Sequence, residues 1–106
     1  MNRIKYIFAT QYSPYPGGRF IRLGEYSGED FRETVLVPVV ESGDFIEIDA
    51  TGVKLSFSPS FLDEAFGGLV KKYGLKKVKE TISFSAKDNR DLEGKMWSFA
   101  EKADKS

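Results

Sequence analysis

The sequence contains no cysteine and no histidine. The first absence excludes disulfide frameworks, cysteine-rich zinc sites and thiol nucleophiles. The second excludes serine–histidine–acid triads and HExxH metal helices. Any acid–base chemistry would therefore have to use carboxylates, lysine or tyrosine. We expect a protein that is not an enzyme and that uses no metal or other cofactor.

Long hydrophobic runs and an excess of one charge are also missing. No stretch approaches the roughly 18 apolar residues of a membrane span. The apolar run after Arg3 and Lys5 is too short for a signal peptide, so we expect a cytoplasmic protein that does not bind membranes. Sixteen basic residues balance sixteen acidic ones, so no global field attracts nucleic acid.

What is present is enough for one packed core. The chain has 106 residues, of which 41% are hydrophobic and 14% aromatic. This composition predicts a single domain over residues 1–106. Residues 101–106 are polar, and we expect this tail to fray.

Alternation of polar and apolar residues predicts four strands, at residues 4–9, 19–23, 45–49 and 81–85. The first two would form a hairpin, joined by a wide loop with two prolines and two glycines over residues 11–18.

Helical periodicity predicts three helices between and after these strands. The first begins at Ser27, whose spacing to Asp30 is typical of a capping box. Pro38 should kink this helix; the alternative is a helix to Leu36 followed by an extended segment. The last helix would begin at Asp88 or Asn89. The order of elements predicts an α/β domain, with a mixed four-stranded sheet and about three helices against it.

The second helix has the clearest signals. Ser58 is a candidate cap before Pro59, and Ser60 with Asp63 is an alternative capping box. Apolar residues recur at helical spacing as far as Tyr73. Gly67 and Gly68 interrupt the pattern, and their cost in helix propensity indicates close backbone packing.

Three groups of residues are candidates for binding. Gly17, Gly18 and Arg19 are typical of an anion-binding turn, or of a plain turn in which Arg19 pairs with Glu25 or Glu29. Asp63 and Glu64 point about 100° apart on a helix, so they favour a helix-dipole role over acid–base chemistry. The third group is a basic patch around Tyr73, formed by Lys71, Lys72, Lys76, Lys77 and Lys79.

Three motifs carry a resemblance to a known family: YPGGR at residues 15–19, GEYSGEDFRE at residues 24–33 and SPSFLDEAFGGL at residues 58–69. They resemble the STAS-like family of uncharacterised small bacterial and phage proteins, which is distantly similar to anti-sigma-factor antagonists. In those antagonists a partner kinase of the GHKL ATPase type phosphorylates a serine at the start of the helix. Ser58 matches the first serine of that loop, whereas Pro59 stands at the serine usually modified.

The resemblance implies a regulatory or adaptor module that binds a protein partner, such as a GHKL-type ATPase, and that is switched by phosphorylation of Ser58 or Ser60. The expected binding face is the loop and helix over residues 58–68, with Ser58, Ser60, Phe61, Asp63, Glu64, Gly67 and Gly68. The alternative is a nucleotide or nucleic-acid binder that uses Arg19, Arg22 and the basic patch. Either a monomer or a homodimer fits the sequence.

Overall fold

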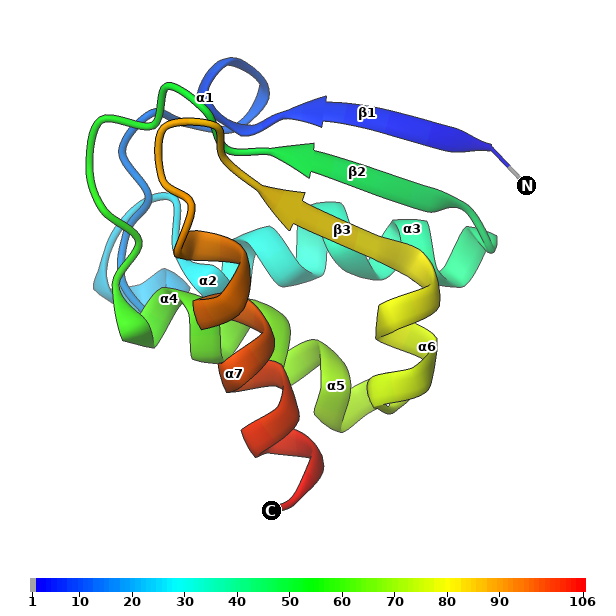
Figure 1. The fold of residues 1–106 in the computed structure, drawn as a ribbon. Helices are drawn as coiled ribbons and strands as arrows, with labels where there is room; N and C mark the ends of the chain where they lie inside the picture. The colour runs from blue at the N-terminus through cyan, green and yellow to red at the C-terminus, as the bar shows by residue number, and fades with distance from the viewer. Residues whose placement is uncertain (1) are drawn as a thin grey trace.

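A computed structural model describes residues 2–106 of the chain. Its sheet has three parallel strands in the order β1-β2-β3 (Figure 1). They are β1 (Arg3–Ile7), β2 (Phe45–Asp49) and β3 (Ile82–Ser85). Ile46 lies beside Ile4 and Ile82, and Ile48 lies beside Tyr6 and Phe84. Alternate residues of the strands therefore present one apolar face.

The prediction of a mixed four-stranded sheet is wrong. Residues 19–23 contain only the 3-10 turn η1 (Ile21–Leu23). The backbone around them is bonded elsewhere: Gly28 donates its amide to Gly18 O at 2.9 Å, and Glu29 donates to Arg19 O at 3.0 Å. The segment therefore lies along the start of the first helix and not beside β1. Period-two alternation alone cannot distinguish these two outcomes.

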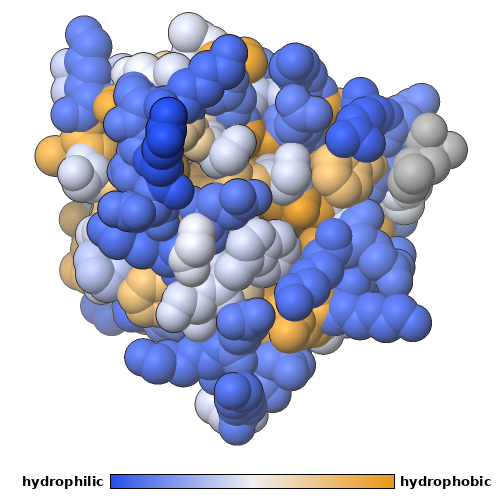
Figure 2. All heavy atoms as spheres, viewed as in Figure 1, coloured by the Kyte–Doolittle hydropathy of each residue, from blue (hydrophilic) through white to orange (hydrophobic). Residues whose placement is uncertain are grey.

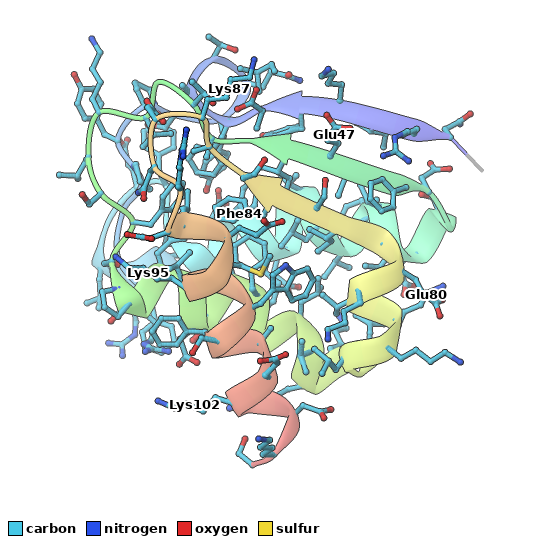
Figure 3. All side chains as sticks on the ribbon, viewed as in Figure 1. Glu47, Glu80, Phe84, Lys87, Lys95 and Lys102 are labelled. Carbon is cyan, nitrogen blue, oxygen red and sulfur yellow. The ribbon has the colours of Figure 1, made fainter. Side chains whose placement is uncertain are left out.

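The helices from α2 to α7 lie on one side of the sheet, and the other face is open (Figure 1). Glu47 projects from the open face, whereas Phe84 points toward the helices (Figure 3). Arg3 and Lys5 approach Glu47 on the open face, at 3.6 and 3.7 Å. The charged side chains explain how a parallel sheet leaves one face in water.

The core is built around phenylalanine rings. Phe8 begins the short helix α1 (Phe8–Gln11) at the end of β1 and is fully buried. Its ring centroid lies 5.0 Å from Phe31 and 6.0 Å from Phe61. Phe66 continues the cluster to Phe84, at 4.8 Å. These rings join the sheet to two long helices.

The first long helix runs over residues 28–42 as α2 (Gly28–Phe31), the π turn η2 (Arg32–Leu36) and α3 (Val37–Ser42). Ser27 caps it by accepting the Asp30 amide at 3.0 Å, as predicted. The helix continues through Pro38 to Ser42, so a single helix is confirmed and the alternative of a helix to Leu36 followed by an extended segment is wrong. The wide π turn precedes the proline, which has no amide hydrogen and crowds the preceding turn.

The second long helix runs over residues 59–73 as α4 (Pro59–Leu62), the π turn η3 (Asp63–Gly67) and α5 (Gly68–Tyr73). Gly74 interrupts it with φ +88°, and α6 (Leu75–Thr81) follows at once. Helical periodicity does not reveal α6, because its lysines obscure the buried Val78 and Thr81.

The last helix, α7 (Leu92–Asp104), packs against the second long helix and against β3. Its N-cap is Asp91, three residues after Asp88 and two after Asn89, the two caps that the sequence predicts. The Asp88 carboxylate does not cap it but accepts the amide of Gly52 at 3.0 Å. The helix continues to Asp104, and Ala103 near its end is buried. The fraying expected over residues 101–106 stays a prediction. Within residues 2–106, no helix combines the length and the apolar character that a bilayer span requires.

Candidate functional site

Ser58 and Ser60 stand at the start of the second long helix, but they have different surroundings. Ser58 is the cap: its Oγ accepts the Phe61 amide at 3.0 Å and lies 3.5 Å from Gly17 O. Ser60 lies in the first turn, is half-buried, and is not the capping residue. The Ser60–Asp63 capping box is therefore wrong, and the hydroxyl of Ser60 is not used in holding the helix end.

Of the residues predicted for a binding face, Phe61 and Gly67 are buried, and Gly68 is half-buried beneath the Arg32 side chain. Phe61 is fully buried among core rings. A Cβ on Gly67 would lie 3.4 Å from Ala103 Cβ, because α7 covers this glycine. A Cβ on Gly68 would fall against the Arg32 guanidinium. The close packing predicted from the two glycines is confirmed: α7 covers Gly67, and the Arg32 side chain lies over Gly68.

The structure brings Arg19, Asp63 and Glu64 together in an ionic network that also includes Arg32. Arg19 Nη1 donates to Asp63 Oδ2 at 2.8 Å and to Glu64 Oε1 at 3.2 Å. Arg32 Nη1 donates to Glu64 Oε2 at 2.6 Å and to the backbone oxygen of Glu64 at 2.7 Å. The network joins the loop before the first long helix to the second long helix.

Both guanidinium groups in the network have raised pKa values. The hydrogen bond to Asp63 is the main cause for the raised pKa of Arg19. For Arg32, burial lowers the pKa, but the bonds to Glu64 and Glu33 outweigh that effect. Both arginines therefore stay charged, and the carboxylates neutralise them. Partly exposed ion pairs add little to the free energy of folding. The pairs of Arg19 with Asp63 and Glu64 therefore serve mainly to fix the position of the loop before the first long helix.

The glycines at residues 17 and 18 do not form an open anion nest. The Gly17 amide donates to Tyr26 O at 2.8 Å, and Gly18 O accepts the Gly28 amide. A Cβ on Gly17 would overlap the backbone oxygen of Glu25. Arg19 pairs with Asp63 and Glu64 and not with Glu25 or Glu29. The arrangement thus favours a structural turn over an anion site.

Tyr12, which no sequence motif marks as a site residue, lies beneath the same loop. Its hydroxyl donates to Asp30 Oδ2 and lies 3.3 Å from Ser27 O. Burial raises the pKa of Tyr12, and the hydrogen bond to Asp30 raises it further. No spacing in the sequence connects residues 12 and 30, so only the folded chain reveals this pair.

Exposed large hydrophobic side chains gather on two neighbouring loops, residues 12–27 and 50–58. They are Tyr15, Ile21, Leu23, Tyr26 and Leu55, with exposed fractions between 42% and 68%. The two loops lie together because the Lys54 amide donates to Pro14 O at 2.8 Å. Figure 2 shows hydrophobic atoms at the left margin, where these loops lie in Figure 1. We call this set the apolar loop surface; it adjoins Ser58, whose Oγ contacts Gly17 O.

The basic patch lies elsewhere, around the turn between α5 and α6. All five of its lysines are exposed. Acidic residues lie among them: Tyr73 donates to Glu41 at 2.8 Å, and Lys79 lies 3.7 Å from Glu101. Arg19 and Arg22 belong to the loop at the opposite end of the molecule (Figure 1). The two arginines and the basic patch therefore do not form one nucleic-acid site. Among residues 2–106, no group of three or more acidic side chains is arranged to hold a metal ion.

Comparison with known proteins gives one family. The family model described as a STAS-like domain of unknown function matches residues 27–92. The match begins at the cap of the first long helix and ends at the first residue of α7. No curated protein and no solved structure matches the chain. The matched range contains both long helices.

Proposed function

The chain belongs to the family of STAS-like domains of unknown function, and from that premise we propose that it is a non-enzymatic module that binds a protein partner. One observation carries the proposal. Large exposed hydrophobic residues gather on the two loops beside the start of the second long helix and do not scatter over the surface. A contiguous exposed apolar surface is typical of a protein interaction site.

The binding face differs from the one predicted over residues 58–68. Phe61 and Gly67 support the face from inside, and its accessible part consists of the exposed Pro59, the half-buried Ser58 and Ser60, and the apolar loop surface. Asp63 and Glu64 hold Arg19, so they fix the position of the loop that carries most of that surface. The partner class suggested by the family resemblance is a GHKL-type ATPase or kinase.

Ser60 is the better candidate for a phosphorylation switch. Ser58 Oγ already caps the helix, whereas Ser60 lies one turn before Asp63 and Glu64 on the same side of the helix. A phosphate on Ser60 would add nearly two negative charges beside these carboxylates. It would repel them and compete for Arg19, which would change how the loop is held.

Binding is tested by isothermal titration calorimetry with a purified GHKL-type ATPase from the same organism as the candidate partner. Leu55→Asp should weaken the complex at least ten-fold, because a leucine side chain buried at an interface contributes about 1.5–3 kcal/mol. Ser98→Asp, at an exposed position of α7, adds the same charge away from the face and should leave the affinity unchanged. Equal affinity of the Leu55→Asp variant and the wild type would contradict the proposed face.

The switch is tested by intact-mass measurement after incubation with the same ATPase and ATP. We expect one added phosphate on the wild type, none on Ser60→Ala, and one on Ser58→Ala. Ser58→Ala should also lower stability by about 1 kcal/mol through loss of the helix cap. No added mass with a kinase shown to be active, or modification of Ser58 instead, would rule out this switch.

A further inference from the structure

The loop before the first long helix contains a groove that the ionic network does not use. It has a volume of about 620 Å³ and is lined by Ile21, Arg22, Leu23, Gly24, Glu25, Tyr26 and Asp30. Ile21 and Leu23 are 53% and 68% exposed, so the aliphatic part of the lining is in water. A partner that covers these side chains would bind more tightly, because removing apolar surface from water lowers the free energy of the complex.

Two of the three charged residues that line the groove are acidic. Glu25 and Asp30 belong to the lining, and Glu29 is adjacent and accepts the Ile21 amide at 2.9 Å. The cation of the lining, Arg22, lies over the Phe20 ring at 5.3 Å from its centroid. Among the described residues, the Glu25 carboxylate accepts no hydrogen bond and forms no ion pair. The Glu25 carboxylate is therefore available to a cation beside the aliphatic side chains, next to the Asp30 carboxylate that accepts the Tyr12 hydroxyl.

Tyr26 holds the groove in a defined shape. Its φ of +55° lies in the left-handed region, which is unfavourable for a residue with a bulky side chain. Its carbonyl accepts the Gly17 amide at 2.8 Å, and its ring packs edge-on against Tyr12 at 5.5 Å. Residues held in such conformations concentrate at binding sites, where the surrounding structure compensates for the strain.

We propose that this groove binds a segment of the partner protein in which arginine or lysine is flanked by aliphatic residues. The aliphatic residues would cover Ile21 and Leu23, and the cation would lie against Glu25 and Asp30. The stem of a long basic side chain also covers apolar surface while its charged end stays near water. This inference rests on the proposed function and names the chemistry of the partner segment. The same carboxylates disfavour the phosphates of nucleic acid.

The probe is a synthetic peptide, Ser-Leu-Arg-Ile-Lys-Leu-Ser, titrated into the isotopically labelled protein and followed by amide chemical shifts in NMR. We expect shifts confined to residues 21–26 and 30. A peptide with glutamate in place of arginine and lysine should bind at least ten-fold more weakly. Glu25→Gln should reduce the affinity for the basic peptide up to about five-fold, as expected for one exposed ion pair. Leu23→Ser should reduce it about ten-fold.

Two controls separate this inference from the proposed function. Glu93→Gln removes an exposed carboxylate of α7 and should not change peptide binding. Leu55→Asp lies outside the groove and should also leave peptide binding unchanged while it weakens the ATPase complex. Absence of shifts at millimolar peptide, equal binding of the acidic peptide, or shifts outside the groove would overturn the inference. Peptide binding without an ATPase complex would overturn only the proposed function.

Discussion

At the scale of single residues, Tyr12 connects parts of the chain that the sequence keeps apart. It follows β1 and α1, and its hydroxyl donates to Asp30 in the first turn of the first long helix. Its ring also packs against Phe8 and Phe31, at 5.2 and 5.0 Å. One side chain thus contributes a charge-assisted hydrogen bond and core packing beside the groove.

Tyr12→Phe should destabilise the protein at neutral pH by about 1–2 kcal/mol, because Asp30 loses the bonded hydroxyl. The folded pKa of Tyr12 is raised, so folding favours the protonated phenol. Above about pH 10 the unfolded tyrosine loses its proton and the folded one keeps it, so this stabilisation decreases as pH rises. Urea denaturation at pH 7 and pH 10.5 should show a smaller difference between the variants at the higher pH. A difference that stays constant would contradict this account.

Single residues of the site also differ in how far the sequence predicts them. The cap at Ser58 and the close packing at Gly67 and Gly68 follow from local rules of helix ends and glycine cost. The partners of Arg19 do not, because Asp63 and Glu64 are more than 40 positions away. Exposure of Ile21 and Leu23 was also unpredictable, because their alternation is equally typical of a half-buried strand.

At the scale of elements, the two long helices cross in close backbone contact. Gly28, the first residue of α2, lies against the second long helix: a Cβ there would lie 2.5 Å from Phe61 O and 3.2 Å from Ala65 N. One turn later, Arg32 crosses over Gly68 to reach Glu64. Both helices contain a π turn beside this crossing, at η2 and η3.

Gly28→Ala should therefore destabilise the protein by about 2–4 kcal/mol, because backbone atoms and not a flexible side chain occupy the space. Gly94→Ala is the matched control. Its Cβ would meet nothing within 4 Å on α7, so replacing a helical glycine should stabilise by up to about 1 kcal/mol. Urea denaturation of both variants measures the difference. Similar effects of the two substitutions would show that the helices do not cross at Gly28.

Elements were predictable where a capping signal and periodicity agreed. Both long helices follow from such patterns, and alternation alone predicts the strand at residues 45–49 and the strand at residues 81–85, which begins one residue later at Ile82 because Thr81 ends α6. The strand predicted at residues 19–23 failed because its backbone hydrogen bonds go to the start of α2. The number and direction of the strands depend on which edges pair, and that is a long-range property.

At the scale of the whole molecule, α7 closes the core from the side away from β1. It packs on η3 and α5 and contacts β3 (Figure 1). Ala103 lies near its end and is 8% exposed, with its Cβ beside Gly67. The end of α7 thus covers the middle of the second long helix.

Deletion of residues 101–106 should lower the free energy of unfolding by roughly 1–2 kcal/mol, because Ala103 and the last helical turn no longer cover Gly67. Deletion of residues 105–106 alone, beyond the helix, should have an effect within about 0.5 kcal/mol. Urea denaturation followed by circular dichroism should give a single transition for both. Equal stability of the two truncated chains would show that the end of α7 does not contribute to the core.

The strand order β1-β2-β3 has a consequence for how the chain assembles. Each strand pairs with the strand made just before it, so no strand needs to enter between two that are already paired. Chains emerge from the ribosome at about 5–20 residues per second, with the N-terminal part first. The sheet can therefore grow in the direction of synthesis, one strand and its helices at a time. The last step is the docking of α7, which joins the end of the chain to the helix made midway through it.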